Sequence, residues 1–411
     1  MTTNRDVDEA VSAPTLSDIE AAREILAGVA IRTPMEESRW LSAAAGGPVL
    51  LKCENLQRTG SFKIRGAYLR MSRLSADERA NGVVAASAGN HAQGVALAAQ
   101  LLGIKSTVFM PEGAPIPKEK ATRGYGAEVR FRGHSVDEAL VAAKEFASTT
   151  GAVLIHPFDH RDIVTGQGTC GLEVVEQCLD ARTVLVPAGG GGLIAGMATA
   201  IKGRKPDVQV VGVQAEGAAA YVDSLRQGHP VPLGGMSTMA DGIAVGCPGE
   251  VPFQAVQKYV DEVVTVSEES LSRALLMLLE RAKLMVEPAG AAAVAALLEH
   301  PDRFATPAVV VLSGGNVDPL LLMRVIRHGM AAEGRYLAFK VLLPDLPGGL
   351  AKLLCELAEV EANVLDVIHE RTSARLHLDE VEVALQVETR GPQHAERVLA
   401  RLRECGYHVE G

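Results

Sequence analysis

The stretch VLVPAGGGGLIAG, from Val184 to Gly196, begins as a short apolar strand, turns through four glycines and continues as a helix. The first N–H groups of a helix and its dipole favour an anion at such a junction, most often a phosphate. The loop contains no Lys or Arg and lacks the GK[ST] of a Walker loop. Gly190, Gly192 and Ala195 also fit the dinucleotide pattern G-x-G-x-x-A, and Glu216 ends the next predicted strand. By itself the stretch leaves a dinucleotide, another phosphate and a structural turn open.

Short apolar, β-branched strands alternate with helices on both sides of this stretch. The predicted strands cover residues 48–54, 82–90 (a strand that runs into a turn), 105–111, 127–133, 152–158, 182–188, 208–215 and 307–315. The predicted helices cover 17–28, 66–78, 91–103, 135–149, 192–203 and 271–283. Such alternation is typical of parallel sheets with helices between the strands. The sequence therefore predicts an α/β body that ends near residue 330.

The tail has a different order of elements. Residues 336–411 are predicted to form strand, helix, strand, strand, helix and strand, the βαββαβ order of a ferredoxin-like unit. Residues 331–335, AAEGR, form the expected linker. We therefore expect two domains in series, 1–330 and 336–411.

Composition limits the class of partner. The 411 residues carry a formal net charge of −10 with 4% aromatic residues, which argues against a nucleic-acid or anionic-membrane partner. The six cysteines are scattered without a CxxC pair, so we expect neither a disulfide framework nor a zinc site. Residues 1–15 are polar and acidic, unlike a signal peptide. The uncharged run 183–201 contains Pro187 and four glycines, which argues against a membrane helix. We expect a cytoplasmic protein.

Three other short stretches carry chemistry. AASAGNHAQG, residues 85–94, places Ser87 to Asn90 at a strand-to-helix turn, which suits a carboxylate or a simple helix cap. VVVLSGGNVD, residues 309–318, ends an apolar strand at Ser313, where a hydroxyl could meet a ligand ring. RTGSFKIRGA, residues 58–67, sets Lys63 between apolar neighbours. Lys63 is either a lysine that reaches solvent or a desolvated amine able to form a Schiff base.

One ligand accounts for all four stretches, namely pyridoxal 5′-phosphate. Its aldehyde would take the amine and its phosphate the glycine loop, whereas a nicotinamide cofactor would leave Lys63 and Ser313 without a role. SFKIRGA, SAGNHAQG, GGGGL and SGGN, in this order and spacing, resemble the fold-type II pyridoxal-phosphate enzymes. Within them the threonine ammonia-lyase (threonine dehydratase) family is most similar, with HPFD at 156–159 and MADG at 239–242 in support.

The resemblance covers roughly residues 15–325. It implies a tryptophan synthase β-like fold with two parallel-sheet lobes, in which a small lobe of roughly residues 50–155 is inserted in the large one. The tail resembles an ACT domain, the amino-acid-sensing module of regulated biosynthetic enzymes.

The resemblance also implies residue roles. Lys63 binds the cofactor through a Schiff base and later removes the Cα proton, Phe62 lies against the ring, Asn90 binds the ring hydroxyl and Ser313 contacts the ring nitrogen. The phosphate is assigned to Gly189, Gly190, Gly191, Gly192 and Leu193, and the substrate carboxylate to Ser87, Ala88, Gly89, Asn90 and His91. Glu287 matches a family position near the cofactor whose role is open, and Arg65 has no assigned role.

The implied reaction converts L-threonine to 2-oxobutanoate and ammonia, and L-serine to pyruvate. A hydroxyl at Ser313 leaves the ring nitrogen largely neutral, which suits elimination. Serine racemases of this fold carry a serine where this chain has Ala88, which disfavours racemisation. The alternatives are a serine racemase or serine dehydratase of the same fold and, outside the class, an NAD-binding oxidoreductase.

For the tail, the resemblance implies an amino-acid effector near Leu346, Gly348 and Asn363, feedback in isoleucine biosynthesis, and a homotetramer or homodimer. A dimerisation module without a ligand is the alternative. No metal site is predicted, because Pro157 interrupts the spacing of His156 and His160, and because Val222 replaces the acidic partner expected for Glu216.

Overall fold

A computed structural model describes residues 12–371, 377 and 379–410. The chain divides into two compact units between Leu322 and Met323. Helix α15 (Pro319–Ala332) crosses this division, so the residues just before the predicted linker are helical.

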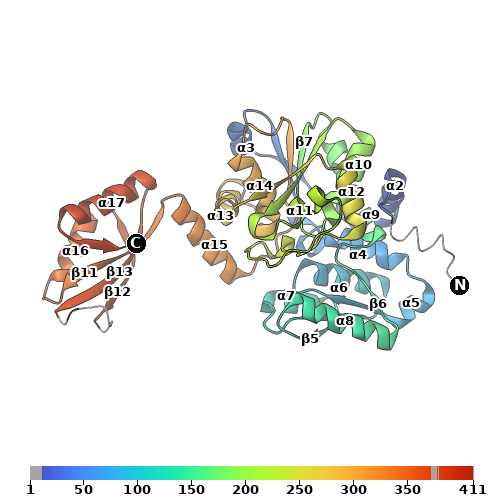
Figure 1. The fold of residues 1–411 in the computed structure, drawn as a ribbon, viewed down its shortest axis with the longest axis horizontal. Helices are drawn as coiled ribbons and strands as arrows, with labels where there is room; N and C mark the ends of the chain where they lie inside the picture. Colours follow the sequence, from blue (N-terminus) through green and yellow to red (C-terminus); the bar gives the residue numbers. More distant parts are fainter. Residues whose placement is uncertain (1–11, 372–376, 378, 411) are drawn as a thin grey trace. The chain divides into compact units, whose positions relative to one another are not determined.

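A six-stranded sheet forms the centre of the first unit (Figure 1). Its order is β1-β2-β10-β7-β8-β9, and every pair except β1–β2 is parallel. The strands are β1 (Met35–Glu37), β2 (Val49–Lys52), β10 (Ala308–Val311), β7 (Thr183–Pro187), β8 (Gln209–Ala215) and β9 (Glu262–Val266). Strands β7 and β10 are buried along their whole length, which explains their continuous Val- and Leu-rich sequences.

The helices of this lobe include five that the sequence did not predict. The helices are α2 (Leu16–Leu26), α3 (Arg39–Ala44), α9 (Arg161–Gln177), α10 (Gly192–Arg204), α11 (Ala220–Gln227), α12 (Glu250–Tyr259), α13 (Glu268–Met277) and α14 (Pro288–Glu299). Of these, α3, α9, α11, α12 and α14 lie in segments without a predicted helix. Helices α9 and α14 are buried around most of their circumference, so they lack the apolar stripe by which a surface helix is found.

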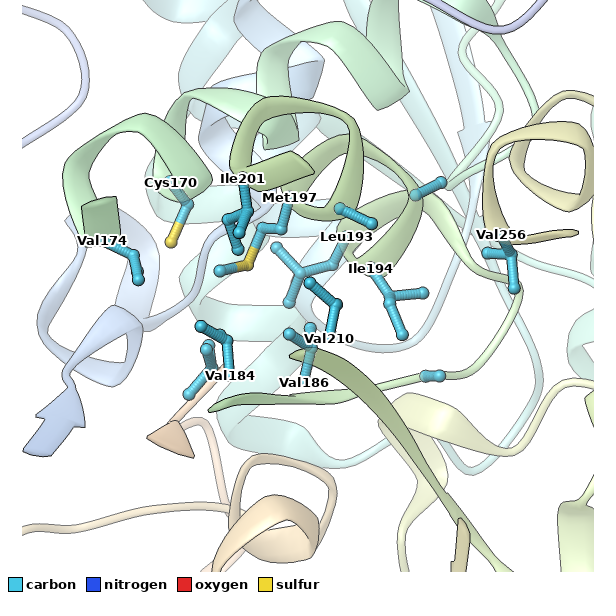
Figure 2. Close-up of a cluster of buried hydrophobic side chains, with 14 of the residues drawn as sticks. Cys170, Val174, Val184, Val186, Leu193, Ile194, Met197, Ile201, Val210 and Val256 are labelled. Atoms are coloured by element: carbon cyan, nitrogen blue, oxygen red, sulfur yellow. The ribbon is translucent and has the colours of Figure 1, made fainter. Parts of the chain in front are cut away.

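The main core lies between α9, α10 and strands β7 and β8. Figure 2 shows Met197 and Ile201 of α10 above Val184, Val186 and Val210 of the strands. Helices α9 and α10 approach closely, because a Cβ at Gly196 would lie 2.2 Å from the Val164 carbonyl oxygen. Substituting alanine there would force the helices apart, and each core side chain contributes roughly 1.5–3 kcal/mol by burial.

A second, four-stranded parallel sheet is built from the chain between β2 and β7. Its order is β5-β4-β3-β6, with strands β3 (Val83–Ala86), β4 (Ser106–Met110), β5 (Glu128–Phe131) and β6 (Val153–Leu154). Its helices are α4 (Lys63–Ser72), α5 (Ala76–Asn81), α6 (Asn90–Leu102), α7 (Ile116–Gly124) and α8 (Val136–Thr150). The first unit therefore has the two parallel sheets expected of a fold-type II enzyme.

Two predicted elements of this lobe were wrong in extent. The helix predicted at 66–78 is two helices, because Ser75 starts α5 with a capping box. The first of them, α4, already begins at Lys63. The strand predicted at 152–158 is only two residues long, since the chain leaves the sheet at Ile155 before the HPFD turn.

The second unit confirms the predicted βαββαβ order. It contains β11 (Tyr336–Pro344), α16 (Gly349–Glu359), β12 (Asn363–Glu370), β13 (Glu380–Glu388), α17 (Pro392–Glu404) and β14 (His408–Glu410). The antiparallel sheet has the order β12-β13-β11-β14. Its own core includes Val341, Leu353, Val383 and Leu402. In neither unit do the described residues form a helix long and apolar enough to cross a membrane.

Candidate active site

The carboxyl ends of three parallel strands meet at one cavity of the first unit. The glycine loop follows β7, the Ser87–Asn90 turn follows β3, and Ser313 follows β10. The cavity has a volume of about 510 Å³. Its walls include every residue assigned to cofactor or substrate from the sequence, namely Phe62, Lys63, Ser87, Ala88, Gly89, Asn90, His91, Gly189, Gly190, Gly191, Gly192, Leu193 and Ser313. Strand ends of α/β sheets are where ligands of this fold class bind.

Lys63 is the first residue of α4, and local pairing brings it beside Ser313. An isolated bridge joins Ser61 to Gly314, and the Phe62 N–H donates to the Ser313 carbonyl oxygen at 3.3 Å. Lys63 Nζ donates to the Pro157 carbonyl oxygen at 3.0 Å and lies 5.0 Å from the centroid of the Phe62 ring. Burial lowers the pKa of Lys63 to about 8, although the charge of Glu287 acts in the opposite direction. The amine is therefore much closer to its neutral form at pH 7 than an ordinary lysine.

The glycine loop is shaped so that only backbone lines it. Gly191 has φ +99°, and a Cβ there would lie 1.8 Å from the Tyr221 hydroxyl. A Cβ at Gly190 would lie 2.5 Å from the Phe158 ring. The first N–H groups of a helix have no acceptor within the helix itself. None of the described side chains caps the start of α10, so these N–H groups are available to a ligand. The loop is a cradle for an anion that needs no cationic side chain.

The amide of Asn90 is held from both sides by residues that the sequence did not assign. Asn316 Nδ2 donates to Asn90 Oδ1 at 2.8 Å and to the Thr59 carbonyl oxygen at 2.6 Å. Asn90 Nδ2 in turn donates to Glu287 Oε1 at 2.5 Å. Because an amide nitrogen has two N–H groups, one N–H of Asn90 remains for a ligand.

Glu287 is a second buried titrating group in the same cavity. Burial, and then the negative charge of Asp241, raise the pKa of Glu287 to about 7. Lys118, the hydrogen bond from Asn90, and Lys63 act in the opposite direction. The pKa values of Lys63 and Glu287 therefore both lie close to neutral pH, a pattern found at sites that move protons.

The HPFD segment lines the cavity with His156, Pro157 and Phe158. His156 Nδ1 accepts a hydrogen bond from the Asp159 N–H at 2.8 Å, and His160 caps α9 by accepting from the Asp162 N–H at 3.0 Å. Burial lowers the pKa of His156 to about 4 and that of His91 to about 3, so both rings are neutral at pH 7.

The three residues assigned to an effector do not come together within one chain. Leu346 and Gly348 lie in the loop after β11, next to Pro344, which pairs with Glu380. Asn363 pairs with Glu388, which also pairs with Tyr336 at the other end of β11. Within one protomer, Asn363 therefore lies at the opposite end of β11 from this loop, because α16 carries the chain back along the sheet before β12 begins.

Comparison with known proteins agrees with this geometry. Residues 26–314 match the family described as pyridoxal-phosphate dependent enzymes. An L-threonine ammonia-lyase of Thermotoga maritima is 47% identical over 395 residues, which are 96% of this chain and 98% of the relative. The structure of a processed threonine deaminase isoform from Solanum lycopersicum is 40% identical with TM-score 0.73, over 76% of this chain and 92% of that one. A maize serine racemase structure is 34% identical with TM-score 0.73, over 76% and 96%.

Proposed function

The chain belongs to the family of pyridoxal-phosphate dependent enzymes, and on that premise we propose that it is an L-threonine ammonia-lyase that releases 2-oxobutanoate and ammonia. The observation that carries the proposal is the similarity to the T. maritima enzyme over nearly the full length of both chains. The dinucleotide interpretation of the glycine loop is set aside, because the family model covers that loop.

The residues of the cavity fit the cofactor. Lys63 supplies a buried amine with a lowered pKa, and the glycine loop supplies a cradle that a Cβ would fill. Once bound, pyridoxal phosphate withdraws electrons from the Cα of the substrate. In the proposal, Gly189 to Leu193 hold the phosphate, Phe62 lies against the ring, and the free N–H of Asn90 donates to the ring hydroxyl.

The elimination needs a base near Cα and a site that does not favour other outcomes. Lys63 Nζ accepts the Cα proton of threonine and returns it to the β-hydroxyl, which leaves as water. Water then hydrolyses the remaining enamine to 2-oxobutanoate and ammonia. Support comes from the pKa of Lys63, about 8, which leaves part of the amine neutral at physiological pH. Ser313 offers a hydroxyl to the ring nitrogen in place of a carboxylate, which suits prompt loss of a leaving group.

Serine racemase is the second candidate because the maize structure is also similar. Ala88 lines the cavity and has no proton to give, so the opposite face of the substrate lacks an acid at this position. L-Serine is instead assigned as a slower substrate, giving pyruvate.

The C-terminal unit is assigned to regulation by an amino acid, with isoleucine as the feedback effector of a cytoplasmic, homo-oligomeric biosynthetic enzyme. Its support is the ferredoxin-like order of β11 to β14 and the length of the T. maritima match, which extends over 96% of this chain. Leu346 and Gly348 remain candidate contacts on one protomer, and Asn363 would have to come from a different one.

The test follows 2-oxo acid release from L-threonine by the purified holoenzyme. Rapid formation of 2-oxobutanoate is expected, with slower pyruvate formation from L-serine and no D-serine in a chiral assay. Lys63→Ala is the matched control and should lower turnover by about a thousandfold or more. D-serine as the main product would overturn the lyase proposal in favour of a racemase.

A further inference from the structure

Helix α7 places its residues in an unusual way. Ile116 is 64% exposed, whereas Lys118, two residues later, is 7% exposed and lines the cavity. A lysine is almost never this buried unless its charge has a partner or a purpose. On this helix the apolar side chain is thus exposed and the charged one is buried, so the contacts of the Lys118 ammonium must explain its burial.

Asp241 is the hydrogen-bond partner found for Lys118 within the described part of the chain. Lys118 Nζ donates to Asp241 Oδ2 at 2.9 Å, across the cavity from α7 to the 3₁₀ turn Asp241–Ile243. The Asp241 side chain is 56% exposed, so solvent screens this pair. An ammonium has three N–H groups, and two of them therefore remain for a ligand in the cavity.

The ammonium faces the turn assigned to the substrate carboxylate. A Cβ built on Gly89 would lie 3.9 Å from Lys118 Nζ. Gly89 is the N-cap of α6, and no side chain among the described residues caps that helix. The first N–H groups of a 13-residue helix and a buried cation thus converge on one spot beside Ala88. Both features favour an anion.

We propose that Lys118 binds the carboxylate of the amino-acid substrate, together with the backbone of the Ser87–Asn90 turn. This inference rests on the proposed function, because it is that function which brings a carboxylate to the turn. Asp241 holds the ammonium in place before the substrate arrives. The cofactor phosphate has its own cradle in the glycine loop, where no cationic side chain is needed.

The experiment compares two ligands that differ only in the carboxylate. L-Alanine and L-alaninamide both carry the α-amine and lack a leaving group, so their equilibrium binding is read from the absorbance of the bound cofactor. Lys118→Met should weaken the binding of L-alanine by roughly 10–100-fold, which corresponds to the loss of one charge-assisted hydrogen bond. The same variant should leave the affinity for L-alaninamide unchanged. For L-threonine, KM should rise by a similar factor with kcat nearly unchanged.

Two further variants separate charge from structure. Lys118→Arg keeps the charge and should retain most of the affinity for L-alanine. Lys120→Met removes an exposed lysine of the same helix and should change the affinity for neither ligand. Cofactor loading of each variant is measured first by absorbance titration of the apoprotein.

The outcomes are distinct. An equal loss for L-alanine and L-alaninamide, unchanged binding of both, or a loss of cofactor loading would each overturn the role of Lys118. If Lys118→Met does not fold, Lys118→Gln replaces it. A wild-type enzyme that releases no 2-oxobutanoate yet binds L-alanine through Lys118 would overturn the proposed function alone.

Discussion

Lys63 and Arg65 are two residues apart, yet Arg65 lies in a cluster of fully paired charges and Lys63 in a cavity whose charges are only partly paired. Arg65 joins Lys52, Glu54 and Glu173 in what we call the charge tetrad, whereas Lys63 shares the cavity with Glu287, Lys118 and Asp241, the pocket charges. In the tetrad, Arg65 Nη2 donates to Glu54 Oε1 and Arg65 Nη1 to Glu173 Oε1, both at 2.7 Å. Lys52 Nζ donates to Glu173 Oε2 at 2.5 Å.

The pKa values separate the two groups. Burial alone would raise the pKa of Glu54 and lower that of Arg65, but their mutual attraction outweighs it, so the pKa of Glu54 is lowered and that of Arg65 is raised from their usual values. In the cavity, burial prevails and brings Lys63 to about 8 and Glu287 to about 7. The difference teaches that burial with full pairing fixes a charge, whereas burial with partial pairing makes a proton movable.

The charge tetrad also explains Arg65. It links α4 to the end of β2 and to α9, because Glu54 follows β2 and Glu173 lies on α9. The Thr33 hydroxyl completes Glu54 by donating to Oε1 at 2.6 Å. The tetrad therefore fixes the helix whose first residue is Lys63.

Breaking the charge tetrad should have the largest effect on stability. Arg65→Met leaves Glu54 buried without its cation, and we expect a loss of about 3–5 kcal/mol in the free energy of unfolding. The single tryptophan, Trp40, lies on α3 in the same unit, so its fluorescence during urea unfolding of the apoprotein reports the change.

Arg226→Met is the matched control. Arg226 pairs with Asp223 at 2.7 Å, and its side chain is 73% exposed. Removing this exposed pair should change stability by less than about 1 kcal/mol. Equal effects of the two arginine variants would contradict the distinction between the charge tetrad and ordinary surface pairs.

Glu287→Gln, in contrast to Arg65→Met, should stabilise the apoprotein above neutral pH. The pKa of Glu287 is raised from 4.5 to about 7, so its favourable contribution is complete below pH 4.5 and is lost as pH rises through 7. The free energy of unfolding of Glu287→Gln minus that of the wild-type apoprotein should therefore be greater at pH 8 than at pH 5, by up to about 3 kcal/mol. Urea unfolding at the two pH values measures this.

Glu54→Gln sharpens the same test. The pKa of Glu54 is lowered below 4.5, so its stabilisation is present above that value and is lost only in stronger acid. Glu54→Gln should destabilise the apoprotein by the same amount at pH 5 and pH 8. A pH-independent effect of Glu287→Gln would show that Glu287 does not titrate in this range.

The smallest predicted effect is a pH dependence of cofactor capture. Only the neutral amine of Lys63 reacts with an aldehyde, and its pKa is about 8. The rate at which apoprotein captures pyridoxal phosphate should rise about tenfold per pH unit between pH 6 and 7.5 and level off above pH 8. A lysine titrating at 10.5 would instead show a rate that keeps rising beyond pH 9.

Much of the fold and the cofactor residues could be predicted from sequence because their signals are local. An apolar strand followed by glycines and a helix, as at Val184–Gly196, identifies itself within about 13 residues. The same holds for the turns at Ser87–Asn90 and at Ser313. Strands β7 and β10 are parallel neighbours whose carboxyl ends share one edge, and β3 of the second sheet ends at the same cavity.

The remainder depends on contacts between distant segments. Glu173 is 108 residues from Arg65, Asn316 is 226 from Asn90, and Asp241 is 123 from Lys118. No local pattern announces these pairs. Helix α9 escaped prediction for a related reason, since TGQGTCG at 165–171 reads as a flexible segment but is required for close helix packing.

The central claim is that Lys63 is the amine that binds the cofactor. Pyridoxal phosphate is added to the apoprotein, the complex is reduced with borohydride, and the modified peptide is identified by mass spectrometry. We expect one phosphopyridoxyl group per chain, on Lys63. Modification of Lys118, the other buried lysine of the cavity, or of surface lysines with Lys63 unmodified, would contradict the account.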